Sequence, residues 1–226
     1  MSNLEAIRTG LLILLLGSLA SAAPQPDEPG FRPLFDGRTL DGWKRLGAKA
    51  KSAEEDRGFG VEDGRIVSYG DGGGWLGTTR EYSDFVLRLQ FRLSPGSNSG
   101  VYLRAPADAS HISRTGLEIQ LLDETAPRHQ GIKPWQLTGA VYHVAAPKPG
   151  HLNPPGAWNS LEIRAKGPHV VIVLNGATIV DDRLDRHPEL EAEHPGLKRR
   201  SGLIGLQSHN GRVEFRYVRV KEITEE

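Results

Sequence analysis

The alternation of apolar and polar residues between positions 85 and 93 constrains the fold of this chain more than any other feature. Phe85, Leu87, Leu89, Phe91 and Leu93 are all apolar, and valine, arginine and glutamine occupy the positions between them. Successive side chains of a β-strand point to opposite faces, so the segment predicts a strand with one buried and one solvent-facing side. The buried side needs a second layer of structure to cover it.

Other segments indicate further short strands joined by tight turns. Residues 161–166 alternate in the same way, and residues 169–174 form an apolar, β-branched run. This run ends at Asn175-Gly176, and a second pair, Asp63-Gly64, separates two more short strands. Asn-Gly and Asp-Gly pairs favour two-residue hairpin turns, because both central residues of such turns need a positive φ.

The C-terminal third contains an irregular strand and the one helical turn that we expect. Residues 213–220 alternate but change phase near Tyr217, which predicts a β-bulge. A helical turn is expected within residues 183–198, where two prolines keep it short. With 27 glycines and 15 prolines available for turns, the sequence predicts an all-β protein, an antiparallel two-sheet sandwich.

The N-terminus has the layout of an export signal. Arg8 precedes an apolar run at 11–16, and small residues follow up to Ala22-Ala23, where we expect cleavage. A bilayer span needs about 20 apolar residues, so no stable membrane anchor is expected; an uncleaved tether is the alternative. The predicted organisation is a signal peptide (1–23), a linker (24–30) and one domain (31–226) of a periplasmic or secreted protein.

Charge and cysteine content exclude several classes of function. The 28 basic and 28 acidic residues balance, so the basic surplus typical of a nucleic-acid partner is missing. The chain has no cysteine, which excludes disulfides, thiolate catalysis, cysteine-bound zinc and a lipid-modified N-terminal cysteine. There is also no phosphate-binding loop with its lysine, no serine elbow and no His-x-x-x-His pair.

The segment 116–123 carries the strongest candidates for chemistry. On a strand, Glu118 and Gln120 point to one side and the flanking leucines and isoleucine to the other. Asp123, at or beyond the strand end, adds a second carboxylate, and two acids at such a separation suit general acid/base catalysis or metal ligation. The alternative is an ordinary exposed face that ends in a turn aspartate.

The segment 98–104 adds a cation to the same predicted face. After an Asn98-Ser-Gly turn, Val101 and Leu103 are expected to point inward, with Tyr102 and Arg104 on the polar side. Arg104 offers a fixed fork of donors for a carboxylate or a sugar oxygen. A salt bridge to Glu118 on a neighbouring strand is the alternative for this side chain.

Three more segments contribute candidates. His143, on an expected strand at 139–144, is a base or metal ligand, or else a packed, hydrogen-bonded histidine. In 202–210, Gly205 leaves room for a ligand to approach the sheet, and Gln207 and His209 can donate to hydroxyl groups. Trp158 follows a Pro-Pro-Gly turn and provides either an aromatic platform for a sugar ring or part of the core.

Several segments together resemble the 3-keto-disaccharide hydrolase domain family, formerly a domain of unknown function. The opening Phe31–Trp43 is similar to the family's LF-DG-x-x-LDGW pattern. The other matching segments are 98–104, 116–120, 139–142, 205–209 and 213–216. The resemblance runs from Phe31 to about Glu222 and implies a concanavalin A-like jelly roll that holds carbohydrate on a concave sheet.

The resemblance also implies a reaction and roles for the candidates. In a 3-keto sugar, one base removes the C2 proton and the C1 substituent is expelled, so Glu118 or His143 is the implied base and Arg104 stabilises the oxyanion. Asp123 orients His143 or joins a site for the divalent cation that some members are thought to use. The implied contacts to substrate are Asn98, Gln120, Tyr142, Trp158, Gln207 and His209.

The chain departs from the related glycosidases at two positions. Residues 118–123 are similar in spacing to the Glu-x-Asp-x-x-Glu strand of laminarinase-like enzymes, but Gln120 replaces the middle aspartate and Asp123 the last glutamate. This change argues against a standard retaining double displacement. The alternatives are a non-catalytic carbohydrate-binding module, a conventional β-glucan hydrolase and, least favoured, a structural cell-envelope domain.

Overall fold

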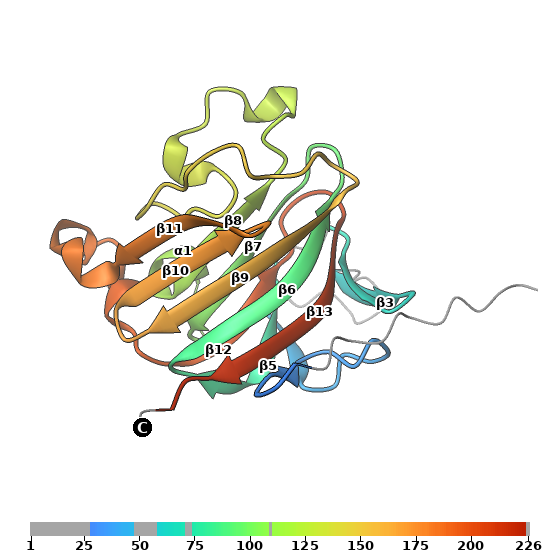
Figure 1. The fold of residues 1–226 in the computed structure, drawn as a ribbon, viewed down its shortest axis with the longest axis horizontal. Coiled ribbons are helices and arrows are strands. Elements are labelled where there is room, and N and C mark those ends of the chain that lie inside the picture. Colours follow the sequence, from blue (N-terminus) through green and yellow to red (C-terminus); the bar gives the residue numbers. More distant parts are fainter. Residues whose placement is uncertain (1–27, 48–57, 71–73, 109, 225–226) are drawn as a thin grey trace, which may run out of the picture.

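The computed structural model describes residues 28–47, 58–70, 74–108 and 110–224, and it shows two antiparallel sheets packed face to face (Figure 1). This arrangement confirms the predicted all-β, two-sheet sandwich. The predicted signal peptide and residues 24–27 of the predicted linker lie outside the described residues. Among the described residues, no helix is both long enough and apolar enough to cross a bilayer.

The first sheet has eight strands, in the order β11-β10-β9-β6-β13-β4-β3, with β1 paired to β13. Its strands are β1 (Arg32–Pro33), β3 (Phe59–Glu62), β4 (Arg65–Ser68), β6 (Phe85–Leu93), β9 (Trp158–Lys166), β10 (His169–Leu174), β11 (Ala177–Arg183) and β13 (Val213–Glu222).

The second sheet has five strands, in the order β2-β5-β12-β7-β8. They are β2 (Trp43–Leu46), β5 (Trp75–Tyr82), β7 (Asn98–Ala105), β8 (Leu117–Leu122) and β12 (Gly202–Gln207). One apolar core fills the space between the sheets, with Leu87 and Phe91 of β6 on one side and Val101, Ile119 and Leu206 on the other, all almost fully buried. Burying these side chains supplies the main driving force for folding.

The turn signals are confirmed. Asn175 and Gly176 connect β10 to β11 with φ angles of 50° and 85°, and Asp63 and Gly64 connect β3 to β4 with 45° and 76°. Two consecutive residues with positive φ make the type I′ geometry that matches the twist of a hairpin.

The predicted bulge in β13 is confirmed as well. Arg216 pairs with Gln90 and Arg219 with Arg88, so two residues of β13 stand opposite a single residue of β6. Tyr217, one of the two, has a φ of +54°. Such a bulge lets neighbouring side chains share one face of the sheet.

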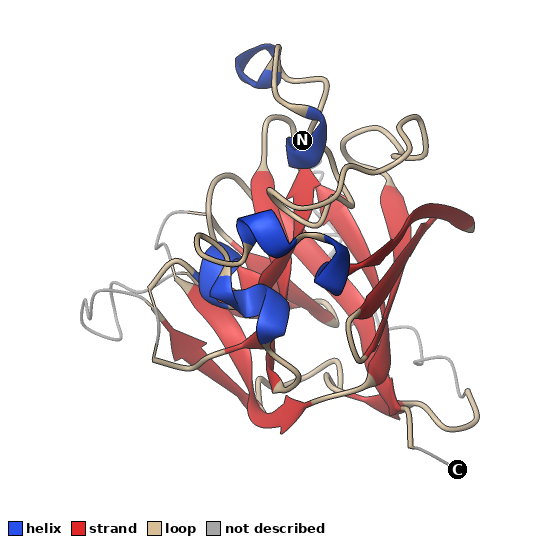
Figure 2. Ribbon diagram, turned by 90° about the vertical axis from the view of Figure 1, so that its left-hand side faces the viewer, coloured by secondary structure: helices blue, strands red, loops and turns tan. Residues whose placement is uncertain are grey.

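Short helices gather on the side of the sandwich that faces the viewer in Figure 2. The predicted helical turn is confirmed as η3 (Leu184–Arg186), η4 (Pro188–Leu190) and η5 (Pro195–Lys198). Three helices were not expected: α1 (Ile112–Thr115), η1 (Pro127–His129) and η2 (Pro134–Gln136).

Two local predictions are wrong. Residues 139–144 do not form a strand, because only Val141 makes isolated bridges, to Ile119 and Ala145. Asn98 to Gly100 are not a turn but the first residues of β7, paired with the end of β8.

Arg104 connects the two sheets from the end of β7. Its side chain is fully buried, and it donates to the carbonyl oxygens of Ser83 (3.0 Å) and Gly167 (2.6 Å) and to the carboxylate of Asp84 (3.1 Å). Its φ is +49°, and the pairing of β7 with β12 shifts register nearby. The prediction that Arg104 shares the polar face with Glu118 is therefore wrong, because the left-handed residue breaks the alternation and turns its side chain away.

We predict that Arg104→Met lowers the free energy of unfolding by about 3–5 kcal/mol, because it removes the buried cation that pairs with Asp84 and that donates to three backbone carbonyl groups, those of Ser83, Gly167 and Arg199. Urea denaturation at neutral pH measures the change. The exposed Arg186→Met is the matched control and should stay within about 0.5 kcal/mol of wild type. Equal stabilities for the two variants would contradict the connecting role of Arg104.

Candidate functional site

A cavity of about 620 Å³ opens on the outer face of the five-stranded sheet, away from the core. Its walls come from β5, β7, β8 and β12 and from the loops beside them. The lining residues are Gly47, Gly74, Trp75, Asn98, Tyr102, Ser110, His111, Ile112, Ser113, Glu118, Gln120, Tyr142, Gln207, Ser208 and His209.

The indole of Trp75 forms the floor of this cavity. A Cβ atom at Gly205 would stand 2.4 Å from the indole, and one at Gly77 would stand 2.6 Å from it, so these two glycines make room for the ring. The edge of the ring meets Tyr102 at a centroid distance of 5.6 Å and an angle of 89°. The expectation that Gly205 leaves space for a ligand is wrong, because Trp75 fills that space.

Glu118 is the buried acid of the cavity. It pairs with Tyr102 across β7 and β8, and its carboxylate lies over Gly100, where a Cβ would stand 2.6 Å from Oε1. The residue is only 4% exposed. Burial raises the pKa of Glu118 to about 8, opposed in part by the amide of Gln207. The carboxyl group is therefore mostly protonated at neutral pH and becomes an effective base near pH 8.

Gln207 and Tyr102 form a fixed pair beside this acid. The Nε2 atom of Gln207 donates to the Tyr102 hydroxyl at 2.6 Å. Burial, and then the charge of Glu118, raise the pKa of Tyr102, so its phenol stays neutral. The hydrogen bond orients the amide of Gln207 and leaves its Oε1 atom buried without a partner among the described residues.

Four polar atoms of the cavity wall, including this Oε1 atom of Gln207, lack a hydrogen-bond partner among the described residues. Trp75 Nε1, Asn98 Oδ1, Gln207 Oε1 and Ser208 Oγ are all buried and have no hydrogen-bond partner within the described part of the chain. A buried polar group without a partner costs about 1–3 kcal/mol. A ligand rich in hydroxyl groups would satisfy both the donor and the acceptors.

Most of the predicted site residues meet in the cavity. Those that line it are Asn98, Glu118, Gln120, Tyr142, Gln207 and His209. Backbone hydrogen bonds hold Tyr142 beside β8, because its N–H donates to the carbonyl of Glu118 at 2.9 Å and the N–H of Gln120 donates to Ala140 at 3.0 Å.

Asp123 lies outside the cavity. Its carboxylate accepts from the backbone N–H groups of Gly96 (2.6 Å) and Thr125 (3.0 Å) and from the Thr125 hydroxyl (2.6 Å). These donors outweigh burial and hold the pKa of Asp123 below its usual value. Asp123 thus ties the β6–β7 loop to the end of β8, and the expectation that it orients His143 is wrong.

His143 also lies outside the cavity. It has a φ of +65°, which turns its ring onto the indole of Trp135 at 3.8 Å and toward His194 at 5.4 Å. Burial, the neighbouring His194 and Arg114 lower the pKa of His143. The rings of His143 and Tyr142 meet edge to face at a centroid distance of 4.6 Å, and only Tyr142 lines the cavity.

Trp158 belongs to the other sheet. It begins β9, and the guanidinium groups of Arg92 and Arg216 lie over its ring at 4.8 Å and 4.0 Å. The implied contact of Trp158 with a substrate held at Glu118 is wrong, because the two residues are on strands of different sheets. It is half-buried rather than part of the core.

The described residues do not form a metal centre. No group of three or more histidine, aspartate or glutamate side chains in the described ranges could hold a metal ion. Glu118 supplies the single carboxylate among the described residues that line the cavity, and the Asp123 carboxylate is occupied by the donors given above. The divalent cation implied by the resemblance therefore does not fit these residues, and we assign no step to it.

Sequence reasoning missed several residues of the cavity. Trp75 forms its floor, and His111 and Ser208 line it. Tyr102 was expected on this polar face but was given no role in the site. Part of the signal for Trp75 was local, because Gly77 lies two residues away on the same face of β5; Gly205 joins it only through the register between β5 and β12. His111 lies in a loop that no local pattern relates to Glu118.

Comparisons with known proteins indicate the same family as the sequence resemblance. The model of the 3-keto-alpha-glucoside-1,2-lyase-like domain family matches residues 30–221. A 3-keto-disaccharide hydrolase from Bacteroides thetaiotaomicron is 25% identical over 234 residues, which cover 86% of this chain and 79% of the relative.

Solved structures are similar over the same part of the chain. A candidate glycosyl hydrolase from Parabacteroides distasonis is 27% identical with a TM-score of 0.72, over 86% of this chain and 94% of that chain. The lumenal domain of VIP36, in a form bound to Ca²⁺ and Man3GlcNAc, shares the fold alone, at 10% identity and a TM-score of 0.53, over 85% and 88% of the two chains.

The raised pKa of Glu118 predicts a dependence of stability on pH. A glutamate has a pKa of 4.5 when unperturbed and about 8 here, so the folded state holds a proton that the unfolded state releases between these values. The free energy of unfolding should therefore fall as pH rises from 5 to 9, by up to roughly 5 kcal/mol from this group.

Glu118→Gln should remove this part of the dependence, measured by urea denaturation across the pH range. Glu81→Gln, at an exposed glutamate of β5, should keep the wild-type slope. A Glu118→Gln variant with the full wild-type slope would show that Glu118 is not the group responsible.

Proposed function

This chain belongs to the 3-keto-alpha-glucoside-1,2-lyase-like domain family, and from that membership we propose that it cleaves 3-keto-disaccharides or 3-keto-glycosides in the cavity around Glu118. The relative from Bacteroides thetaiotaomicron, named a 3-keto-disaccharide hydrolase, supports this substrate class. The family and the relative together support the broader statement that the chain is a carbohydrate-active, hydrolase-like protein.

The observation that carries the proposal is a single buried carboxylic acid in a cavity lined by hydrogen-bonding side chains. Glu118 has a pKa near 8, and partnerless donor and acceptor atoms surround it. A conventional glycosidase needs two carboxylates across the scissile bond. Removal of an acidic C–H proton needs one base, which is what the described lining provides.

The reaction follows from the chemistry of a 3-keto sugar. The carboxylate of Glu118 takes the proton from C2, and the C–H electron pair moves into an enediolate with its charge on the C3 oxygen. When the C3 carbonyl re-forms, the C1–O bond breaks and the leaving oxygen takes the proton from Glu118. Water then adds to the C1=C2 double bond, or the unsaturated sugar leaves as a lyase product.

The surrounding residues would bind and orient the sugar. Trp75 presents its ring to the sugar face, and its unpaired Nε1–H is a donor for developing negative charge, the role first assigned to Arg104. Gln207 would accept a sugar hydroxyl at Oε1 while Tyr102 holds its Nε2. His143 is not needed as the base, because it does not line the cavity.

We expect turnover of 3-keto-trehalose and 3-keto-glucosides by the purified protein, with kcat/KM rising toward pH 8 and levelling above it, because the base must be ionised. Glu118→Gln should lose at least about 100-fold in kcat. The exposed Glu81→Gln is the matched control and should keep wild-type activity.

A second variant tests the role of Glu118 without removing its carboxyl group. Gly100→Ala places a methyl group against the Glu118 carboxylate, so kcat should fall while the fold, followed by circular dichroism, is retained.

Full activity of Glu118→Gln would remove Glu118 from the mechanism. Binding of the keto sugars without turnover by wild type would favour the binding-module alternative, and cleavage of unoxidised β-glucan would favour a conventional hydrolase.

We also propose that the protein is exported, on the basis of the first 23 residues. Expression in a bacterial host should give a periplasmic or secreted chain whose mass corresponds to cleavage near Ala22-Ala23. A full-length chain that stays in the cytoplasm would contradict this proposal.

A further inference from the structure

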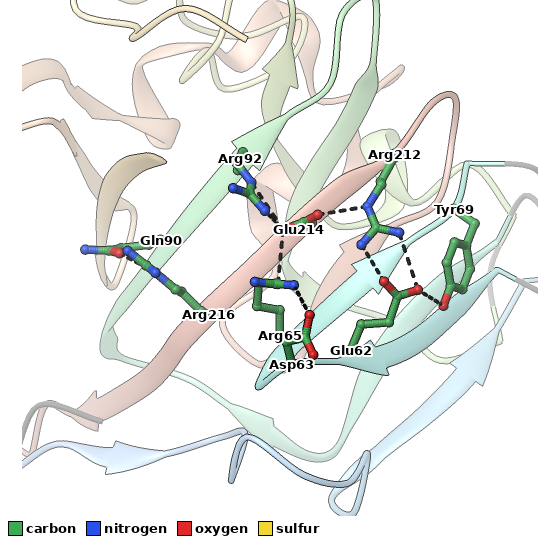
Figure 3. A network of polar contacts seen from close by, with 9 residues as sticks. All are labelled: Glu62, Asp63, Arg65, Tyr69, Gln90, Arg92, Arg212, Glu214 and Arg216. Carbon is green, nitrogen blue, oxygen red and sulfur yellow. Dashed lines mark hydrogen bonds and ion pairs between the residues drawn. The ribbon is translucent and has the colours of Figure 1, made fainter. Parts of the chain in front are cut away.

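The outer face of the eight-stranded sheet carries a network of arginines and carboxylates, part of which is shown in Figure 3. Arg65 (3.2 Å), Arg92 and Arg212 (2.8 Å) all pair with Glu214 on β13. Arg212 also pairs with Glu62 at 2.6 Å. Each of these three guanidinium groups has a carboxylate partner, so their charges are neutralised within the face itself.

A hollow of about 440 Å³ lies on the same face, near the C-terminal end of β13. Phe31, Val86 and Ile223 give it an apolar surface, and Val86 is only 8% exposed. The guanidinium groups of Arg88 and Arg219 lie over the ring of Phe31 at 4.7 Å and 5.6 Å and hold it in place. The volume is within the range of pockets that bind small molecules, about 300–1,000 Å³.

Three cations surround this apolar surface in a defined register. Arg164 on β9 and Lys221 on β13 stand on either side of Val86 on β6. Lys166 lies two residues beyond Arg164 on the same face of β9, and all three cations line the hollow. Neighbouring strands are about 4.8 Å apart and alternate residues about 7 Å apart, so the backbone places the cations roughly 7–12 Å from one another.

The carboxylates near the hollow are bound to other groups. Glu28, the single carboxylate among the described residues that line it, is bound by Arg88 and, at 3.1 Å, by Arg219. Glu162 binds Arg88 at 2.6 Å through one oxygen, and Arg164 lies 3.8 Å from the other. Arg164 therefore has only a distant share of a carboxylate that another arginine already holds.

The two lysines of the hollow have no partner in the described part of the chain. Lys166 and Lys221 are both exposed, and neither has an ion pair or a hydrogen bond there. The side chain of Lys221 lies along the N-terminal segment, because a Cβ at Gly30 would stand 3.1 Å from its Cε and 3.3 Å from its Nζ. Unlike the network in Figure 3, this part of the face has a surplus of cations, which attracts an anionic ligand.

The shape of the hollow favours a sugar acid as that ligand. An apolar surface can bury the C–H face of a sugar ring, while lysine and arginine bind its carboxylate. Because the cations are spread around the hollow, one carboxylate cannot bind all of them, but the carboxylates of an oligomer can. A flat membrane surface would meet the exposed cations and leave Val86, at the bottom of the hollow, without a contact.

We propose that this hollow binds an acidic glycan, a chain of uronic acid residues whose carboxylates pair with Arg164, Lys166 and Lys221. The site is on the opposite sheet from Glu118 and does not depend on the proposed reaction. It holds the protein on an acidic polysaccharide while the cavity accepts a neutral keto sugar.

Calorimetric titration of the chain from residue 24 onward, the mature form expected after export, with trigalacturonate tests the proposal. The double variant Lys166→Gln/Lys221→Gln should bind at least about tenfold more weakly, the loss expected for two exposed charge pairs. Lys221→Arg keeps the charge and should bind within about twofold of wild type. Maltotriose, a neutral trisaccharide, should not bind in the hollow.

Arg186→Gln/Arg216→Gln is the matched control, because it removes two positive charges outside the hollow. Arg186 is exposed, and the Nε atom of Arg216 donates to the neutral Gln90 (Figure 3). This variant should bind trigalacturonate as wild type does. An unchanged thermal midpoint of each double variant confirms that it is folded.

Four results would overturn the proposal. The first two are equal trigalacturonate affinity in wild type and the lysine variant, and equal losses in the two double variants. The third is displacement of trigalacturonate by sulfate at matched ionic strength, which would indicate a general anion site. The fourth is binding to phosphatidylglycerol vesicles that trigalacturonate does not compete, which would indicate a membrane-binding surface. Turnover of keto sugars by the lysine variant should match wild type, so failure of one proposal leaves the other intact.

Discussion

The five-stranded sheet is covered on both of its faces, and this double coverage removes water from Glu118. The inner face packs into the core between the sheets. On the outer face, Trp75, Tyr102 and Ile112 form a second, smaller apolar cluster. Without that cluster the carboxylate would lie on an ordinary solvated strand, and its pKa would have no reason to rise.

Much of the fold was predictable because it follows from local patterns. The bounds predicted for residues 85–93 are those of β6, since alternation reports directly which side chains meet the core. The hairpin turns were predictable from Asn-Gly and Asp-Gly pairs, and the bulge near Tyr217 from a change of phase in the alternation. Each depends on residues that are adjacent in the sequence.

The candidate site was predictable only where alternation continues. Glu118, Gln120 and Gln207 project as a regular strand requires, and all three line the cavity. Arg104 and His143 do not, because each adopts a positive φ that no sequence pattern announced. The pairing of Gly77 and Gly205 around Trp75 depends on the register between β5 and β12, which residues far apart in the chain decide together.

The segment after β8 has a consequence for how the protein behaves in a crowded solution. Gly139 and Tyr142 donate backbone hydrogen bonds to Gln120 and Glu118, and Gln120 donates to Ala140, so these groups along the rim of β8 are already satisfied. An open rim of a sheet is a template on which another chain can add a strand and begin to aggregate. The same short segment that brings Tyr142 to the cavity therefore also shields this end of the sheet from unwanted association.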